Sequence, residues 1–101
     1  MTHRIRGSVK LISTTPKVFG VIVGDDLRDY FFIPSSVRVP GIRAWEHSLE
    51  ALNGLRDSYF ASLTPGMLVE FTPRSTARGM RAGNVSVLRL TERSHGEVLQ
   101  S

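Results

Sequence analysis

Two short stretches decide the fold of this chain: Lys17-Val18-Phe19-Gly20-Val21-Ile22 and Asp29-Tyr30-Phe31-Phe32-Ile33-Pro34-Ser35-Ser36-Val37. Side chains alternate across a β-strand, so residues two apart share a face. Phe19 and Val21 therefore point to one side of the first stretch, and Phe31 and Ile33 share a face of the second. If the strands pair, we expect Phe19 and Phe31 to form an exposed aromatic surface above a buried core. Bases of single-stranded nucleic acid stack on such surfaces, because every base has a π-face.

Further strands are expected on both sides of these stretches. Residues 5–12 predict a first strand, 19–23 and 30–33 the next two, and 67–71 and 85–90 the last two. The first strand has one period-two track, made of Ile5, Gly7, Val9 and Leu11. Tyr30 and Phe32 are expected in the core, and Pro34 should end the third strand because it cannot donate to a ladder. Short strands joined by turns predict an all-β meander that closes into a small barrel or sandwich.

The segment from 38 to 63 interrupts this pattern with a helix, which we predict over about 43–58 with a possible break at Gly54. Its apolar residues recur at steps of three or four. They are Trp45, Leu49, Leu52, Leu55 and Tyr59, followed by Phe60. We expect this stripe to pack on the barrel. The alternative is an interface for another copy or a larger partner, through Trp45, Leu49, Leu52 and Tyr59.

Composition and charge bound the possible functions. The 101 residues predict one domain over 1–90, with the helical insertion at about 38–63, and a flexible tail over 91–101. There is no cysteine, which excludes disulfides and thiolate metal sites. No apolar run approaches the ~20 residues that span a bilayer, and the N-terminus lacks an apolar signal core, so a cytoplasmic location is the default expectation. The net charge of +4 permits a nucleic-acid partner, and the excess positive charge lies outside the central segment.

Four motifs in order resemble those of the cold-shock domain family. They are Gly7-Ser8-Val9-Lys10 with Lys17-Val18-Phe19-Gly20-Val21-Ile22, then Asp29-Tyr30-Phe31-Phe32-Ile33-Pro34-Ser35-Ser36-Val37, Gly66-Met67-Leu68-Val69-Glu70-Phe71, and Gly79-Met80-Arg81-Ala82-Gly83-Asn84-Val85. The matches cover about half of the chain. The resemblance implies a five-stranded OB-fold barrel, here with an inserted α-helix between strands 3 and 4. It also implies binding of single-stranded RNA or DNA.

The chain departs from the family on the face that binds bases. Leu11 stands where the family has a stacking tryptophan, Val21 where it has the second aromatic of its Phe-Gly-Phe motif, and Ile33 where it has a histidine. Phe19 and Phe31 remain from the aromatic surface. Each base–aromatic contact is worth ~1–3 kcal/mol, so the binding surface is reduced. The remaining apolar patch is equally suited to receive protein.

The leading hypothesis is therefore a non-enzymatic binder of single-stranded RNA or DNA. Phe19 and Phe31 would stack on bases, while lysines and a basic loop over 72–83 hold phosphates. The predicted nucleic-acid-binding residues are Lys10, Leu11, Lys17, Phe19, Val21, Phe31, Ile33, Arg74, Arg78 and Arg81. The second hypothesis is an accessory subunit of a nucleic-acid-processing complex that docks through the inserted helix or the apolar face. No catalytic constellation, metal-ligand cluster or cofactor motif is evident in the sequence.

Overall fold

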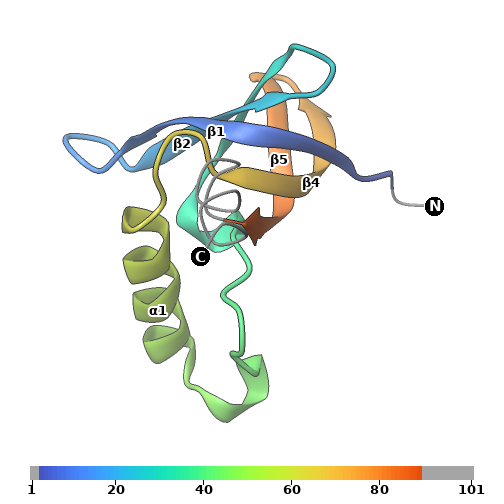
Figure 1. The fold of residues 1–101 in the computed structure, drawn as a ribbon. Helices are drawn as coiled ribbons and strands as arrows, with labels where there is room; N and C mark the ends of the chain where they lie inside the picture. Colours follow the sequence, from blue (N-terminus) through green and yellow to red (C-terminus); the bar gives the residue numbers. More distant parts are fainter. Residues whose placement is uncertain (1–2, 90–101) are drawn as a thin grey trace, which may run out of the picture.

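A computed structural model describes residues 3–89 and shows a closed β-barrel with one α-helix (Figure 1). The strands are β1 (Ile5–Ser13), β2 (Phe19–Gly24), β3 (Asp29–Phe32), β4 (Leu68–Thr76) and β5 (Gly79–Arg89). Between β3 and β4 lie two 3₁₀ turns, η1 (Pro34–Ser36) and η2 (Ala44–Glu46), and the helix α1 (Leu49–Ala61). The predicted five-stranded barrel with a helix between strands 3 and 4 is confirmed, and its layout is compatible with an OB-like fold.

The barrel closes in the strand order β1-β2-β3-β5-β4. All neighbouring strands are antiparallel except β3 and β5, which run parallel and share the single ladder pair Phe31↔Arg81. A separate parallel bridge, Val37↔Val85, continues this seam beyond η1. As expected, β3 ends before Pro34. In the described part of the chain, no helix is long and apolar enough to cross a membrane.

The core lies inside the barrel and confirms the predicted role of Tyr30 and Phe32, which are both almost fully buried. Tyr30 packs on Phe71 with ring centroids 4.8 Å apart, and its hydroxyl donates to Asp26 Oδ2 at 2.5 Å. Phe32 lies against Gly20, where an added Cβ would collide with the phenylalanine ring. Gly20 is therefore required for the close approach of β2 to this core ring.

A β-bulge between Val9 and Leu11 changes which side of β1 faces the core. Val9 is buried opposite Ile22, but Leu11 pairs with Val21 and is 37% exposed. The single track predicted from Ile5 to Leu11 is therefore wrong at its last member. One extra residue shifts the alternation by one position, and Ile12 packs against the core instead.

Residues 72–83 form a hairpin, so the predicted basic loop is wrong. β4 runs to Thr76 and β5 starts at Gly79, leaving only Ala77 and Arg78 as the turn. The ladder pairs Thr72 with Gly83 and Thr76 with Gly79. Ala82 is buried and Met80 packs against the core, but residues 74–79 are exposed and mostly polar, so apolar alternation is a poor guide to this end of the hairpin.

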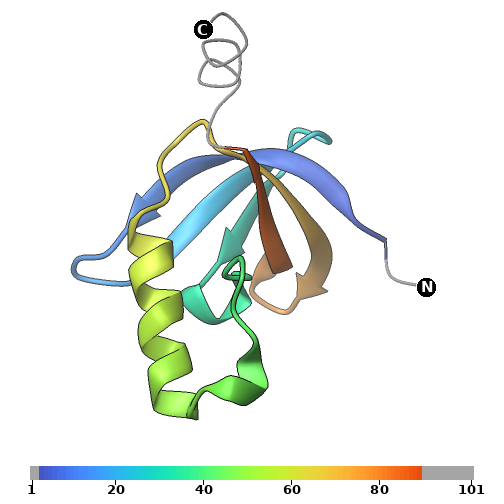
Figure 2. The same cartoon turned by 60° about the horizontal axis from the view of Figure 1, so that its bottom comes forward.

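The insertion forms an arm that projects from the barrel (Figure 2). The helix starts later and ends later than predicted, at Leu49 and Ala61, and it continues through Gly54. Ser48 determines the start, because its side chain accepts a hydrogen bond from the backbone N–H of Ala51 and so caps the helix. Trp45 lies before this cap, in η2, and is 79% exposed.

Helix α1 packs on the barrel through its last turns, and the start of the arm is tied to β5 by the hydrogen bond from the Arg38 N–H to the Val85 carbonyl. Phe60 is buried and meets Phe32 edge to face, with ring centroids 5.3 Å apart, and Leu63 is buried just beyond the helix. Leu49, at the far end, is 72% exposed. The expectation that the apolar stripe is buried along its whole length is therefore wrong. The helix is too steeply inclined for its first turns to reach the barrel surface (Figure 1).

Candidate nucleic-acid interface

A single row of residues crosses the outer face of all five strands. Its members are cross-strand neighbours in the order Leu11, Val21, Phe31, Arg81 and Arg74, from β1 through β2, β3 and β5 to β4. We call this set the cross-strand row. It passes from an aliphatic end through an aromatic ring to two adjacent arginines. Directly opposed side chains on one sheet face are in contact range, so the row forms one continuous surface.

The aromatic part of this surface consists of Phe19 and Phe31. Their ring centroids are 5.8 Å apart and the ring planes meet at 28°, which is a stacked arrangement. Phe31 is 47% exposed, and Ile33 beyond it is 36% exposed. Both phenylalanines therefore come together as the sequence predicts, and Phe31 offers the larger accessible ring for a base.

Val21 and Leu11 differ in what they offer to a ligand. Val21 faces outward but is only 5% exposed, because it lies between the larger side chains of its neighbours in the row. It supports the surface from beneath and presents almost no area to a base. Leu11 is accessible, because the β1 bulge turns it outward.

Arg81 and Arg74 lie directly opposite each other at the cationic end of the row. Both are exposed, and neither forms an ion pair with any residue that the structure describes. Like charges directly opposed on a sheet destabilise it. An anion held between the two guanidinium groups removes this repulsion, so the pair is suited to a phosphate. The sequence placed both residues on a loop and gave no sign of this juxtaposition.

A cavity of about 420 Å³ opens beside the two arginines. Phe31 and Ile33 line it together with Arg74 and Arg81. The remaining polar lining residues are Ser35, Ser36, Thr76 and Asn84. An aromatic ring, two guanidinium groups and several hydroxyls thus converge on one space. That combination can accommodate a base and its phosphate together.

The two lysines and the turn arginine contribute less clearly. Lys10 Nζ lies 3.1 Å from Asp29 Oδ2, so its charge is already paired in the absence of a ligand. Lys17 is exposed in the β1–β2 loop, near Phe19 in sequence. Arg78 occupies the hairpin turn, where its backbone N–H donates to Thr76 Oγ1 and its side chain is exposed. Only Arg74 and Arg81 are brought beside the aromatic surface by the sheet register.

The four predicted partner-binding residues are separated along the arm. Trp45 and Leu49 are exposed near its tip, and the Arg43 guanidinium lies 5.8 Å from the centre of the Trp45 ring. Leu52 is half-buried, and Tyr59 packs against the barrel core. Burial raises the pKa of the Tyr59 hydroxyl. The arm therefore presents a small apolar tip, formed by Trp45 and Leu49, rather than a continuous stripe.

The described residues contain no group of three or more His, Asp or Glu side chains that could hold a metal ion. No family model matches the chain, and no curated protein matches it. The fold and the geometry of the outer face are therefore the basis on which its function is inferred.

Proposed function

We propose that this protein binds single-stranded RNA or DNA without catalysing a reaction, on a surface similar to that of cold-shock domains. The observation that carries the proposal is the cross-strand row, in which an exposed aromatic ring adjoins two unpaired arginines. Bases stack on Phe31 and Phe19, and the phosphate backbone contacts Arg81 and Arg74. The order of motifs along the sequence and the confirmed barrel layout both support this proposal.

The test is titration of a fluorescein-labelled single-stranded oligonucleotide by fluorescence anisotropy. Replacing both rings, Phe19→Ala with Phe31→Ala, is expected to weaken binding at least tenfold, because each stacked base is worth ~1–3 kcal/mol. The matched control is Leu27→Ala, which removes an exposed apolar side chain from the β2–β3 turn, away from the row. Unchanged affinity in the double variant, with its circular dichroism intact, would sink the stacking model.

Salt dependence gives a second readout of the same proposal. Each phosphate neutralised by a cation contributes a slope of about −0.7 to the logarithm of affinity against the logarithm of salt for single strands. Arg74 and Arg81 together are therefore expected to account for a slope of about −1.4. A salt-independent affinity would contradict a role for these arginines in phosphate binding.

A second candidate function is protein contact through the apolar tip of the arm. The specific observation is the exposure of Trp45, which is 79% exposed, and of Leu49, which is 72% exposed, on the arm that projects from the barrel. Two exposed large apolar side chains close together in sequence are suited to contact with another protein surface. Light scattering over a range of protein concentrations tests this for self-association. A strict monomer whose Trp45 fluorescence is unchanged by concentration rules out a second copy as the partner.

A further inference from the structure

A second groove continues the first one toward the helical arm. This groove has a volume of about 300 Å³ and shares Ser35, Ser36 and Asn84 with the cavity beside Phe31. Its other polar lining residues are Arg38 and Arg56. Since the two spaces have three lining residues in common, they adjoin, and together they extend from the cross-strand row to the base of the arm; we call them the path.

The lining of this path has an unusually one-sided charge. Arg74 and Arg81 lie at one end, Arg38 and Arg56 lie at the other, and no aspartate or glutamate lines either part. None of the four arginines forms an ion pair within the part of the chain that the structure describes. We call this set the arginine path. Four unpaired guanidinium groups along one groove favour a polyanion over a neutral or cationic ligand.

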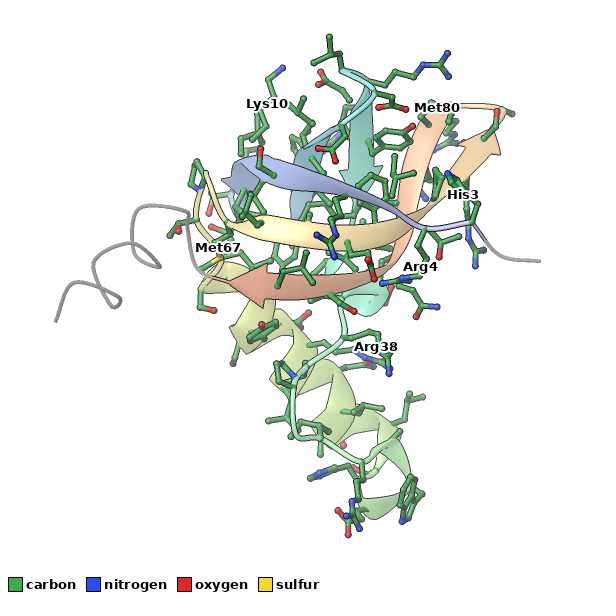
Figure 3. The ribbon with its side chains drawn as sticks, turned by 45° about the vertical axis from the view of Figure 1, so that its right-hand side comes forward. His3, Arg4, Lys10, Arg38, Met67 and Met80 are labelled. Atoms are coloured by element: carbon green, nitrogen blue, oxygen red, sulfur yellow. The ribbon has the colours of Figure 1, made fainter. Side chains whose placement is uncertain are left out.

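The backbone holds the arm end of the path in a fixed position. The N–H of Arg38 donates to the Val85 carbonyl at 2.8 Å, directly after the Val37↔Val85 bridge, so Arg38 is tied to β5. Arg56 is half-buried on α1, whose last turn is anchored by Phe60. Figure 3 shows Arg38 at the point where the chain leaves the barrel for the arm. Both cations are therefore presented by ordered elements.

An alternative exit from the aromatic surface is less suited to a nucleic-acid backbone. A third cavity, of about 500 Å³, also includes Ile33 and Ser35, but Val18, Pro34 and Phe60 make it mostly apolar. The charged side chain that lines it is Asp57, which repels phosphates. Of the two exits that meet at Ser35, the arginine path is the one whose charge suits a polyanion.

We infer that a bound single strand leaves the barrel surface along the arginine path, so that Arg38 and Arg56 extend the binding site onto the base of the inserted arm. This inference rests on the proposed function and deepens it. Half-buried Leu52 and Ile42 belong to the apolar part of the groove lining, and Arg38 and Arg56 contact phosphates. The arm then serves to lengthen the nucleic-acid site, and its apolar tip lies beyond the end of the bound strand.

The test compares oligouridylates of about four nucleotides, the short end of the usual site range of one OB-fold, with oligouridylates of about twelve nucleotides, and uses oligothymidylates as a DNA arm. The variant Arg38→Gln with Arg56→Gln is expected to lose about tenfold in affinity for the long oligomer and to reduce its salt slope by about 1.4. Affinity for the short oligomer, which is confined to the cross-strand row, is expected to stay the same.

The matched control carries the same loss of charge outside the path, as Arg28→Gln with Arg43→Gln. Because Arg56 is half-buried, the single variant Arg38→Gln, at an exposed position, repeats the test where the fold is not in question. Lysine at both positions should restore most of the salt slope. If the variants bind the long oligomer as tightly as the control does, the inference is overturned and the groove remains available to a protein. If the unmodified protein binds neither oligomer, the proposed function fails as well.

Discussion

The arginine side chains at the β4–β5 hairpin differ in whether the fold supplies partners for them. Arg4, just before β1, donates hydrogen bonds to Glu70 Oε1 at 3.2 Å, the Asn84 carbonyl at 2.9 Å and the Glu70 carbonyl at 3.1 Å. It also reaches the hydroxyls of Thr72 and Ser86. Arg74 and Arg81, on the hairpin itself, have no ion pair within the described residues. The guanidinium group of Arg4 is therefore occupied by contacts within the fold, whereas those of Arg74 and Arg81 remain able to contact a ligand.

The partners of Arg4 lie at a bulge in the hairpin. Between Glu70 and Thr72 the ladder register shifts, with an extra residue on β5 where Asn84 adopts a φ of 50°. A bulge leaves backbone groups without ladder partners. The Arg4 guanidinium lies beside β4 and β5 (Figure 3). It supplies the missing hydrogen bonds, since one of its nitrogens donates to both the Glu70 and the Asn84 carbonyls. The many donors that make arginine a phosphate ligand are here directed at carbonyl oxygens.

Removing the partnered arginine should have the largest effect on stability. Arg4→Ala is expected to lower the free energy of unfolding by about 2–3 kcal/mol, because it leaves two carbonyls without their charged donor and removes the nearer of the two arginines that pair with Glu70. Oligonucleotide affinity, measured on the folded fraction, should not change. Urea unfolding of both proteins measures the difference. A loss below about 0.5 kcal/mol would show that water replaces Arg4 at the bulge without penalty.

Removing the unpaired arginines should lower oligonucleotide affinity without lowering stability. Arg74→Gln with Arg81→Gln is expected to leave stability unchanged or to raise it by up to about 1 kcal/mol, since like charges no longer oppose each other. Oligonucleotide affinity should fall at low salt, and the difference from the unmodified protein should shrink as salt is added. The same urea and anisotropy measurements apply. Marked destabilisation would show that these side chains serve the fold instead.

The smallest expected effect concerns the Asp26 carboxylate, whose hydrogen bond from Tyr30 makes stability depend on pH. The hydrogen bond from Tyr30 lowers the pKa of Asp26 below its ordinary value of 3.8, and the same bond raises the pKa of Tyr30 above 10.0. The Asp26 contribution to stability is therefore present above pH 3.8 and is lost as pH falls through the lowered pKa. The Tyr30 contribution is present below pH 10.0 and is lost as pH rises through the raised pKa.

Thermal unfolding as a function of pH tests this pair. Asp26→Asn should flatten the acid side of the stability profile relative to the unmodified protein, and Asp25→Asn, which removes a neighbouring carboxylate with no such bond, is the control. Equal acid sensitivity in all three proteins would exclude the Tyr30–Asp26 bond as a source of pH dependence.

Apolar alternation was sufficient to predict the strands and a small barrel or sandwich, because core residues such as Tyr30 and Phe32 leave a period-two pattern. The choice of a five-stranded barrel came from the resemblance to cold-shock domains. It also predicted that Phe19 and Phe31 share a surface. It failed where the chain adds a residue or leaves the core. The bulge beside Leu11 has no signature of its own, and the polar end of the hairpin shows no alternation.

The candidate site depends on register, which local sequence does not encode. Nothing near Arg81 in the sequence indicates that it lies beside Phe31, because that contact joins two strands that are neighbours only after the barrel closes. Arg38 and Arg56 were missed for the same reason. The capping signal at Ser48 was available in the sequence, and its use would have placed the start of the helix correctly. The flexible tail predicted over 91–101 lies outside the described residues.

The seam between β3 and β5 has a consequence for how ligand and fold depend on each other. The barrel closes there through one ladder pair, Phe31↔Arg81, and one bridge, Val37↔Val85. A nucleic-acid strand that stacks on Phe31 and binds Arg81 would contact both β3 and β5 and hold the two strands together. If the ligand binds the closed barrel and not the unfolded chain, the melting temperature would rise as the ligand concentration increases. Amide protons along the seam would exchange more slowly in the complex than in the free protein. The part of the barrel with the fewest ladder pairs would then become one of its best-protected regions.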